Sequence, residues 1–139
     1  MRRVKRFLSL APGERTLLVR TLWRLSRTCL ELHLLSREKW QMLLAPATAQ
    51  AATPRQRFSE GQIAWAVRAA ARYVPTANCL PQAIVAKQLL EEQGYHPLLR
   101  IGVQPPQALD LKAHAWVESG GRILVGDDGH PYQPLGAAR

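Results

Sequence analysis

A helix that begins at a cysteine is the most constrained segment of this 139-residue sequence. Asn78 is a favourable N-cap, and Pro81 fits only in the first helical turn, where no internal donor is lost. At 100° per residue, the stripe that begins at the cysteine consists of Cys79, Ala83, Ala86 and Leu90. We therefore expect the helix to begin at Cys79, with its thiol at the top of the face that packs inward.

The expected position of Cys79 suits a nucleophile. A helix N-terminus has unpaired N–H groups and partial positive charge, which favour a thiolate and a developing oxyanion. The alternative is a small buried apolar residue, which is common for a cysteine without partners. The residues downstream must distinguish these two interpretations.

Length and cysteine usage limit the kind of protein this is. A chain of 139 residues can bury one good core. Cys29 and Cys79 lie far apart without paired spacing, so we expect no disulfide framework, no zinc motif and no cofactor, and a reducing cytoplasm fits. The apolar run 7–11 is too short for the core of a signal peptide.

The net charge of +9 is distributed unevenly. Residues 1–57 hold twelve Lys or Arg against three Glu, whereas residues 58–139 hold seven basic and seven acidic side chains. We expect the basic part to meet something acidic, namely a peptide, a partner protein or anionic lipid. A nucleic-acid partner is not expected, because the basic stretch lacks a recognisable reading motif. Regular arginines exclude a membrane span there and leave contact with a membrane surface open.

The first part of the chain, residues 1–45, is predicted to be a basic helical extension. An amphipathic helix is expected from Pro12 to about Leu35, and Ser36 caps a second expected helix that ends at Leu44. The apolar face of the first helix is expected to hold Leu18, Leu22, Leu25, Cys29 and Leu32. Trp23 and Trp40 are expected to pack rather than to bind a ligand.

Residues 46–57 form a predicted linker, and residues 58–139 form the predicted core. The linker has small residues and prolines without an apolar period. In the core, Ser59 and Gln62 predict a capping box, followed by a helix whose apolar stripe extends to Val74. Gly94 predicts the end of the helix that begins at Cys79.

Three strands are predicted after these helices, so the expected fold class is α+β. Residues 98–103 have strand composition, and residues 113–118 and 122–127 form a hairpin around Gly120 and Gly121. Period-two alternation puts His114, Trp116 and Glu118 on one side of the first hairpin strand. Ala113, Ala115 and Val117 are expected on the other side.

Cys79, His114 and Asp127 together match what hydrolysis by a thiol requires. The reaction needs a thiolate, an imidazole that protonates the leaving amine, and a carboxylate that holds the imidazole in the correct tautomer. His114 and Asp127 are symmetric about the turn at 120–121, so an antiparallel hairpin would place them side by side. The order of these residues along the chain predicts a catalytic triad.

Other interpretations of the same residues stay open at this point. His114 fits a core histidine bonded to a carbonyl, and Asp127 and Asp128 fit ordinary turn carboxylates. A zinc site built from Cys79, His114 and an aspartate is a further alternative, although no local ligand pair such as CxxC or HxxxH supports it.

Several segments resemble the lasso-peptide leader peptidases, the protease component of lasso-peptide biosynthesis. The resemblance covers roughly residues 58–135, and the basic helices before residue 45 are also similar to those of the stand-alone members. It is carried by Asn78-Cys79-Leu80, the helix end at 92–95, the strand at 99–103 and above all Ala113-His114-Ala115-Trp116-Val117-Glu118. This resemblance implies a core similar to transglutaminase and papain-like cysteine hydrolases.

The resemblance also implies roles for the site residues. Cys79 would be the nucleophile, His114 the general base and acid, and Asp127 the third member, with Asp128 as the alternative. The implied reaction cleaves one peptide bond and releases the leader from a lasso precursor, whose core a macrolactam synthetase then closes. Because residues 1–57 are predicted to be helical, a separate leader-recognition protein is the expected partner.

One departure from the family pattern concerns the oxyanion site. Papain-like enzymes often place a glutamine a few residues before the cysteine, and residues 73–78 contain none. The backbone N–H of Cys79 would then act with a second donor that the sequence does not identify. Two other functions stay open: an acyl transferase of transglutaminase type, and a non-enzymatic helical scaffold that binds a leader peptide, a partner protein or a membrane.

Overall fold

The computed structural model describes residues 2–34, 56–104 and 112–135. The helices in these ranges are α1 (Arg2–Leu8), α2 (Pro12–Leu34), α4 (Glu60–Ala71) and α5 (Cys79–Glu92), and the strands are β1 (Leu98–Val103), β2 (Ala113–Ser119), β3 (Arg122–Val125) and β4 (Gln133–Pro134). Helices followed by a small antiparallel sheet confirm the α+β class. The predicted helix at 36–44, with Trp40, lies outside the described residues, as does almost all of the predicted linker.

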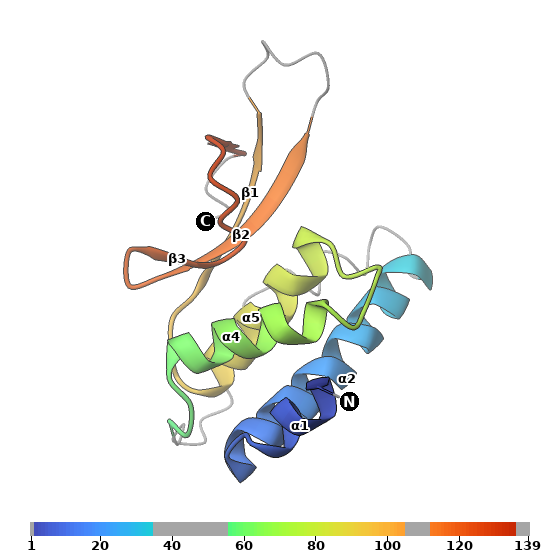
Figure 1. Ribbon diagram of the computed structural model, residues 1–139. Coiled ribbons are helices and arrows are strands. Elements are labelled where there is room, and N and C mark those ends of the chain that lie inside the picture. The colour runs from blue at the N-terminus through green and yellow to red at the C-terminus, as the bar shows by residue number, and fades with distance from the viewer. Residues whose placement is uncertain (1, 35–55, 105–111, 136–139) are drawn as a thin grey trace.

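The elements form three layers (Figure 1). The sheet lies on one side, α4 and α5 pack together against it, and α2 packs against both of these helices with α1 beside it. The core cluster draws Leu25 and Cys29 from α2, Ile63 and Val67 from α4, and Val117 from β2. Helix α2 therefore shares one core with the helices and strands downstream of it.

The helix predicted from residue 12 is confirmed, but its buried face includes only part of the predicted apolar stripe. The fully buried residues of α2 are Leu17, Thr21, Leu25, Thr28 and Cys29. Thr21 can occupy this face because its hydroxyl donates a hydrogen bond of 2.7 Å to the Leu17 carbonyl oxygen. Of the predicted face, Leu18, Leu22 and Leu32 are only half-buried.

Trp23 was predicted to pack, and this prediction is wrong. Its side chain is 61% exposed, and the Arg27 guanidinium carbon lies 5.5 Å from the centre of its ring. Two residues along a helix are about 200° apart, so Trp23 points away from the core that Leu25 enters. The indole therefore stacks with a cation at the surface instead of contributing to the core.

Two of the predicted helix ends are confirmed in detail. At the start of α4, the Gln62 amide donates to the Ser59 hydroxyl and the Ser59 amide donates to the Gln62 side chain, which is a complete capping box. At the end of α5, Gly94 has φ of 84°, and the Tyr95 amide donates to the Leu90 carbonyl oxygen. This is the glycine-dependent Schellman ending.

The start of α5 is confirmed at Cys79, but its cap differs from the expectation. Asn78 has extended backbone at the N-cap position and makes no side-chain capping hydrogen bond. Gln82 instead donates its side-chain amide to the Ala77 carbonyl oxygen over 2.7 Å. The Gln82 side chain in the first turn therefore stabilises the segment that precedes the helix, and the position of Cys79 does not depend on the Asn78 side chain.

The sheet is antiparallel with strand order β3-β2-β1-β4. Gly120 and Gly121 have φ of 55° and 76°, so the predicted hairpin turns through two left-handed residues. Ser119 pairs with Arg122, but farther along the hairpin Val117 pairs with Val125, one residue beyond the symmetric register. This β-bulge ends the predicted second strand early and shifts everything after it.

Candidate active site

Cys79 is the first residue of α5 and lies half-buried beside the hydrophobic core. Its thiol is free, as is that of the buried Cys29. The predicted stripe below it is confirmed, because Ala83, Ala86 and Leu90 are fully buried. The thiol therefore stands at the end of a rigid face, next to the amides of the first helical turn.

His114 lies near the start of β2, on the side of the strand opposite to the core. Ala115 and Val117 are buried in the core, as the alternation predicts. The Nε2 atom of His114 lies 2.5 Å from the Gly126 carbonyl oxygen. A carbonyl only accepts, so Nε2 carries the hydrogen and Nδ1 is left as an acceptor. The backbone thus holds the tautomer that a general base needs.

Two aromatic side chains flank the imidazole of His114. The Tyr132 ring is stacked on it, with centroids 4.7 Å apart and planes at 22°. Trp116 follows at 6.3 Å and 18°, and its indole N–H donates to Glu118 over 2.8 Å. Trp116 is only 6% exposed because it covers Gly102, where an added Cβ would lie 2.8 Å from the indole. These contacts restrict the rotation of the imidazole.

Asp127 and Asp128 have different surroundings. Asp127 is exposed and accepts a hydrogen bond from the Gly129 amide. Asp128 accepts two hydrogen bonds. The Tyr132 hydroxyl donates to its Oδ2 over 2.7 Å, and the His130 backbone amide donates to its Oδ1 over 3.1 Å. No hydrogen bond joins either carboxylate to His114 within the described ranges. The pairing of β2 with β3 is shifted by one residue at Val117 and Val125 and ends there, so Asp127 is not paired with His114 as the symmetric hairpin predicted.

The electrostatics connect this cluster to the cysteine. The hydrogen bond from Tyr132 is the main cause that lowers the pKa of Asp128, and charge interaction with His114 also lowers it. The same hydrogen bond is the main cause that raises the pKa of Tyr132, and the charge of Cys79 raises it further. The Gln104 side chain acts on the Tyr132 hydroxyl in the opposite direction. The charge of Cys79 therefore acts on the hydroxyl of the same Tyr132 whose ring stacks on His114.

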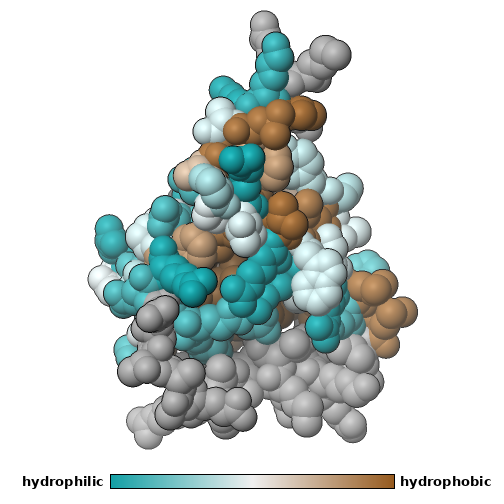
Figure 2. Space-filling view, turned by 90° about the horizontal axis from the view of Figure 1, so that it is seen from below, coloured by the Kyte–Doolittle hydropathy of each residue, from teal (hydrophilic) through white to brown (hydrophobic). Residues whose placement is uncertain are grey.

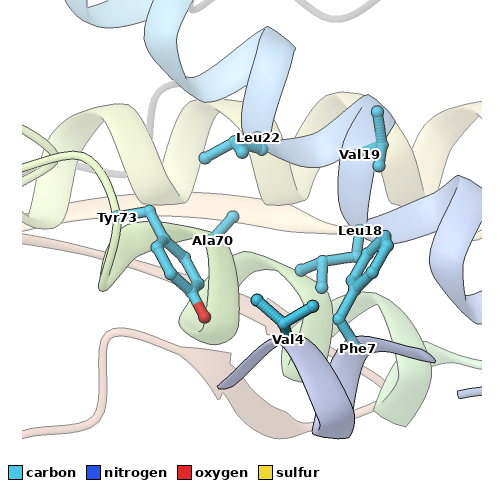
Figure 3. Close-up of a pocket in the computed structure, with 7 residues that line it drawn as sticks. All are labelled: Val4, Phe7, Leu18, Val19, Leu22, Ala70 and Tyr73. Atoms are coloured by element: carbon cyan, nitrogen blue, oxygen red, sulfur yellow. The ribbon is translucent and has the colours of Figure 1, made fainter. Parts of the chain in front are cut away.

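The cavity between the helices is not suited to this chemistry. It has a volume of about 250 Å³ and is lined by Val4, Phe7, Leu18, Val19, Leu22, Ala70 and Tyr73 (Figure 3). None of these side chains is a cysteine, a histidine or a carboxylate. Across the described segments there is also no group of three or more His, Cys, Asp or Glu that could hold a metal ion.

The face seen from below the helices mixes hydrophobic and hydrophilic groups (Figure 2). Some of the arginines on α2 are paired within the chain, since Arg20 and Arg24 contact Glu92 of α5 over 2.8 and 2.5 Å.

Among the helices that the structure describes, none is long and apolar enough to cross a membrane.

Sequence reasoning did not identify Gly126 or Tyr132 as parts of this site. Tyr132 lies directly before β4, which pairs with β1 at the edge of the sheet. A glycine before two aspartates and an aromatic residue after a proline were the available signals. Neither signal could show which ring or carbonyl meets the imidazole.

Comparison with known protein families matches residues 16–137 to the transglutaminase-like superfamily. The match begins within α2 and includes the rest of that helix, α4, α5 and all four described strands. No curated protein and no solved structure is significantly similar to the chain.

Proposed function

The chain belongs to the transglutaminase-like superfamily, and we propose that it is a cysteine peptidase that removes the leader from a lasso-peptide precursor. The superfamily includes cysteine proteases and acyltransferases. One observation carries the proposal: a cysteine lies at the start of α5, and β2, which packs against α5, carries a histidine whose Nε2 is bound to a backbone carbonyl so that Nδ1 is left as the acceptor.

The proposed reaction begins with transfer of the Cys79 thiol proton to Nδ1 of His114. The thiolate attacks the scissile carbonyl, forming a carbon–sulfur bond, and the charge develops on the carbonyl oxygen near the helix start. The imidazolium returns its proton to the leaving amine as the carbon–nitrogen bond breaks. Water then attacks the thioester, loses a proton to Nδ1, and releases the leader acid and the thiol.

The proposed carboxylate of the site is the one predicted from sequence, Asp127, with Asp128 as the alternative. The tautomer of His114 is already held by the Gly126 carbonyl, so a carboxylate would act by stabilising the imidazolium. Charge interaction with His114 favours Asp128 for that role. Replacing each aspartate by asparagine separately, and comparing kcat for cleavage, distinguishes the two.

The proposed partners are the precursor, a separate leader-recognition protein and the macrolactam synthetase that uses the product. The described residues 2–34 form helices rather than strands, and recognition of the leader is proposed to be the task of a separate protein. The excess of positive charge in residues 1–57 supports an acidic partner surface. A contact that charge supplies would weaken as salt is raised.

Mass spectrometry of a lasso precursor incubated with the protein tests the proposal. The reactions are run with and without a leader-recognition protein, and with iodoacetamide or Cys79→Ala as controls. A single cut at the junction of leader and core that disappears in both controls is expected. Intact precursor in every reaction, with Cys79 no more reactive than a free thiol, would refute the proposal and favour the scaffold function.

The acyltransferase alternative has the same support from the superfamily. It would use the same thioester, which an amine instead of water would resolve. Adding a primary amine to the cleavage reaction separates the two functions: a transferase gives the amide of the leader, whereas a peptidase continues to give the free acid.

A further inference from the structure

Tyr132 lies directly before β4, and the pairing of β4 with β1 places it at the candidate site. Gly102 and Val103 of β1 pair with Pro134 and Gln133, and the Leu135 amide donates over 2.8 Å to the Ile101 carbonyl oxygen. This pairing fixes the backbone just after Tyr132 along the edge of the sheet. The ring is thereby held against His114 by backbone hydrogen bonds rather than by packing in a core.

We propose that Tyr132 is a positioning residue of the reaction, whose ring holds the His114 imidazole and whose hydroxyl holds the Asp128 carboxylate beside it. The inference rests on the proposed function, because it concerns the histidine assigned there as general base. It extends that function by assigning a role to a residue outside the predicted triad.

The ring contact supports the first half of this role. At 4.7 Å and 22°, the phenol and the imidazole overlap almost in parallel. Nε2 is bound to the Gly126 carbonyl, so rotation of the imidazole would break both that hydrogen bond and the stack. The ring of Tyr132 thus helps to keep the imidazole in the orientation that the hydrogen bond to Gly126 fixes, and with it the direction of Nδ1.

The hydroxyl contact supports the second half. Asp128 is held through both oxygens, one by Tyr132 and the other by the His130 amide. The charged groups that act on Asp128 are His114 and His130, and those that act on Tyr132 are Asp128 and Cys79. The phenol therefore joins a carboxylate and an imidazole that come from two different segments, the loop after β3 and the strand β2.

Two variants separate the two halves. Tyr132→Phe keeps the ring and removes the hydrogen bond, whereas Tyr132→Leu removes both. Tyr95→Phe is the matched control, because its hydroxyl bonds the Phe58 carbonyl oxygen over 3.3 Å at the opposite end of α5. The urea midpoint of every variant is measured so that loss of folding is recognised.

The first readout is the rate at which iodoacetamide alkylates Cys79 as a function of pH, followed by peptide mass spectrometry to separate it from buried Cys29. This readout needs no substrate. We expect Tyr132→Leu to lower the alkylation rate near neutral pH about tenfold, because the base beside the thiol is displaced. Tyr132→Phe should retain most of the neutral reactivity, and Tyr95→Phe all of it.

The second readout is cleavage of the precursor. We expect kcat to fall about a hundredfold in Tyr132→Leu with little change in KM, because a displaced base affects the chemical step. Tyr132→Phe should lose about tenfold, the scale of one hydrogen bond to a charged group. Equal losses in Tyr95→Phe and Tyr132→Phe would overturn the role of the hydroxyl.

Failure of the inference is distinguishable from failure of the proposed function. If the unmodified protein alkylates as an ordinary thiol at every pH, the assignment of Cys79 and His114 fails. If it shows enhanced neutral reactivity that Tyr132→Leu leaves unchanged, the catalytic assignment stands and the positioning role of Tyr132 is wrong.

Discussion

Replacement of Gly126 by alanine is the sharpest test of how the hairpin positions His114. Gly126 has φ of 96°, and its carbonyl accepts the hydrogen bond from the imidazole. A Cβ at this position would lie 2.7 Å from the Ala115 carbonyl oxygen and 2.8 Å from Cβ of Trp116. Neither atom belongs to the end of a flexible side chain, so the strand itself must move.

The cost of Gly126→Ala has two parts. An alanine at positive φ costs about 1–2 kcal/mol. Forcing a methyl group into packed backbone adds about 1–3 kcal/mol, so we expect the free energy of unfolding to fall by about 2–5 kcal/mol. Gly129→Ala is the matched control, because Gly129 has φ of 76° with nothing within 4 Å of the added Cβ. It should lose only the conformational part, about 1–2 kcal/mol.

Urea unfolding at neutral pH measures both variants, with equal m-values required for the comparison. Alkylation of Cys79 in the folded protein is the functional readout. We expect Gly126→Ala to lose neutral reactivity because its carbonyl no longer meets Nε2 of His114, and Gly129→Ala to retain it. Equal destabilisation of the two variants, or full reactivity in Gly126→Ala, would refute the reasoning from the close approach.

Four further predictions concern stability and titration. Leu25→Ala removes a side chain that is 0% exposed at the centre of the core, and should lower the free energy of unfolding in urea by about 2–5 kcal/mol; a loss below that range would show that α2 is loosely packed. Ser59→Ala removes one half of the capping box of α4 and should cost about 1 kcal/mol in the same assay, whereas Ser59→Asp should restore most of the loss. The Tyr132 phenol should ionise above its ordinary pKa of 10.0, because its hydrogen bond to the Asp128 carboxylate raises the pKa, and Asp128→Asn should reduce that shift in an alkaline absorbance titration. Since the pKa of Asp128 is lowered in the fold, its contribution to stability should be present above its ordinary pKa of 3.8 and lost as the pH falls through the lowered value. The free energy of unfolding of Asp128→Asn should therefore depend less steeply on pH in this acid range than that of the unmodified protein.

Local signals in the sequence were sufficient for most of the secondary structure. The capping box at Ser59, the glycine ending at Gly94 and the two-glycine turn at 120–121 each specify a local backbone conformation, and all three are present. The bounds of α1 were not predicted within the helical extension, because residues 2–8 give a basic cluster without a clear apolar stripe. Local reasoning also misjudged Trp23, since the direction of a helix face depends on which neighbours cover it.

The candidate site was predictable in its chemistry but not in its geometry. Cys79 could be assigned to a helix start and His114 to the open face of a hairpin, because capping and alternation depend on neighbours in the chain. The carboxylate could not be placed by counting across the turn. One additional residue in β3 shifts the register, and no residue preference in the hairpin reveals it.

The sequence by itself determined the elements, the α+β class, the thiol at a helix N-terminus and the side of the strand that carries the imidazole. These follow from interactions within a few residues, whose energies depend little on the rest of the chain. Only the tertiary structure decided that a backbone carbonyl at Gly126 holds the tautomer of His114, and that Tyr132, from the far end of the chain, stacks on it. Those contacts join segments brought together by a bulge and by pairing of β4 with β1, and their geometry is set by the packed sheet as a whole.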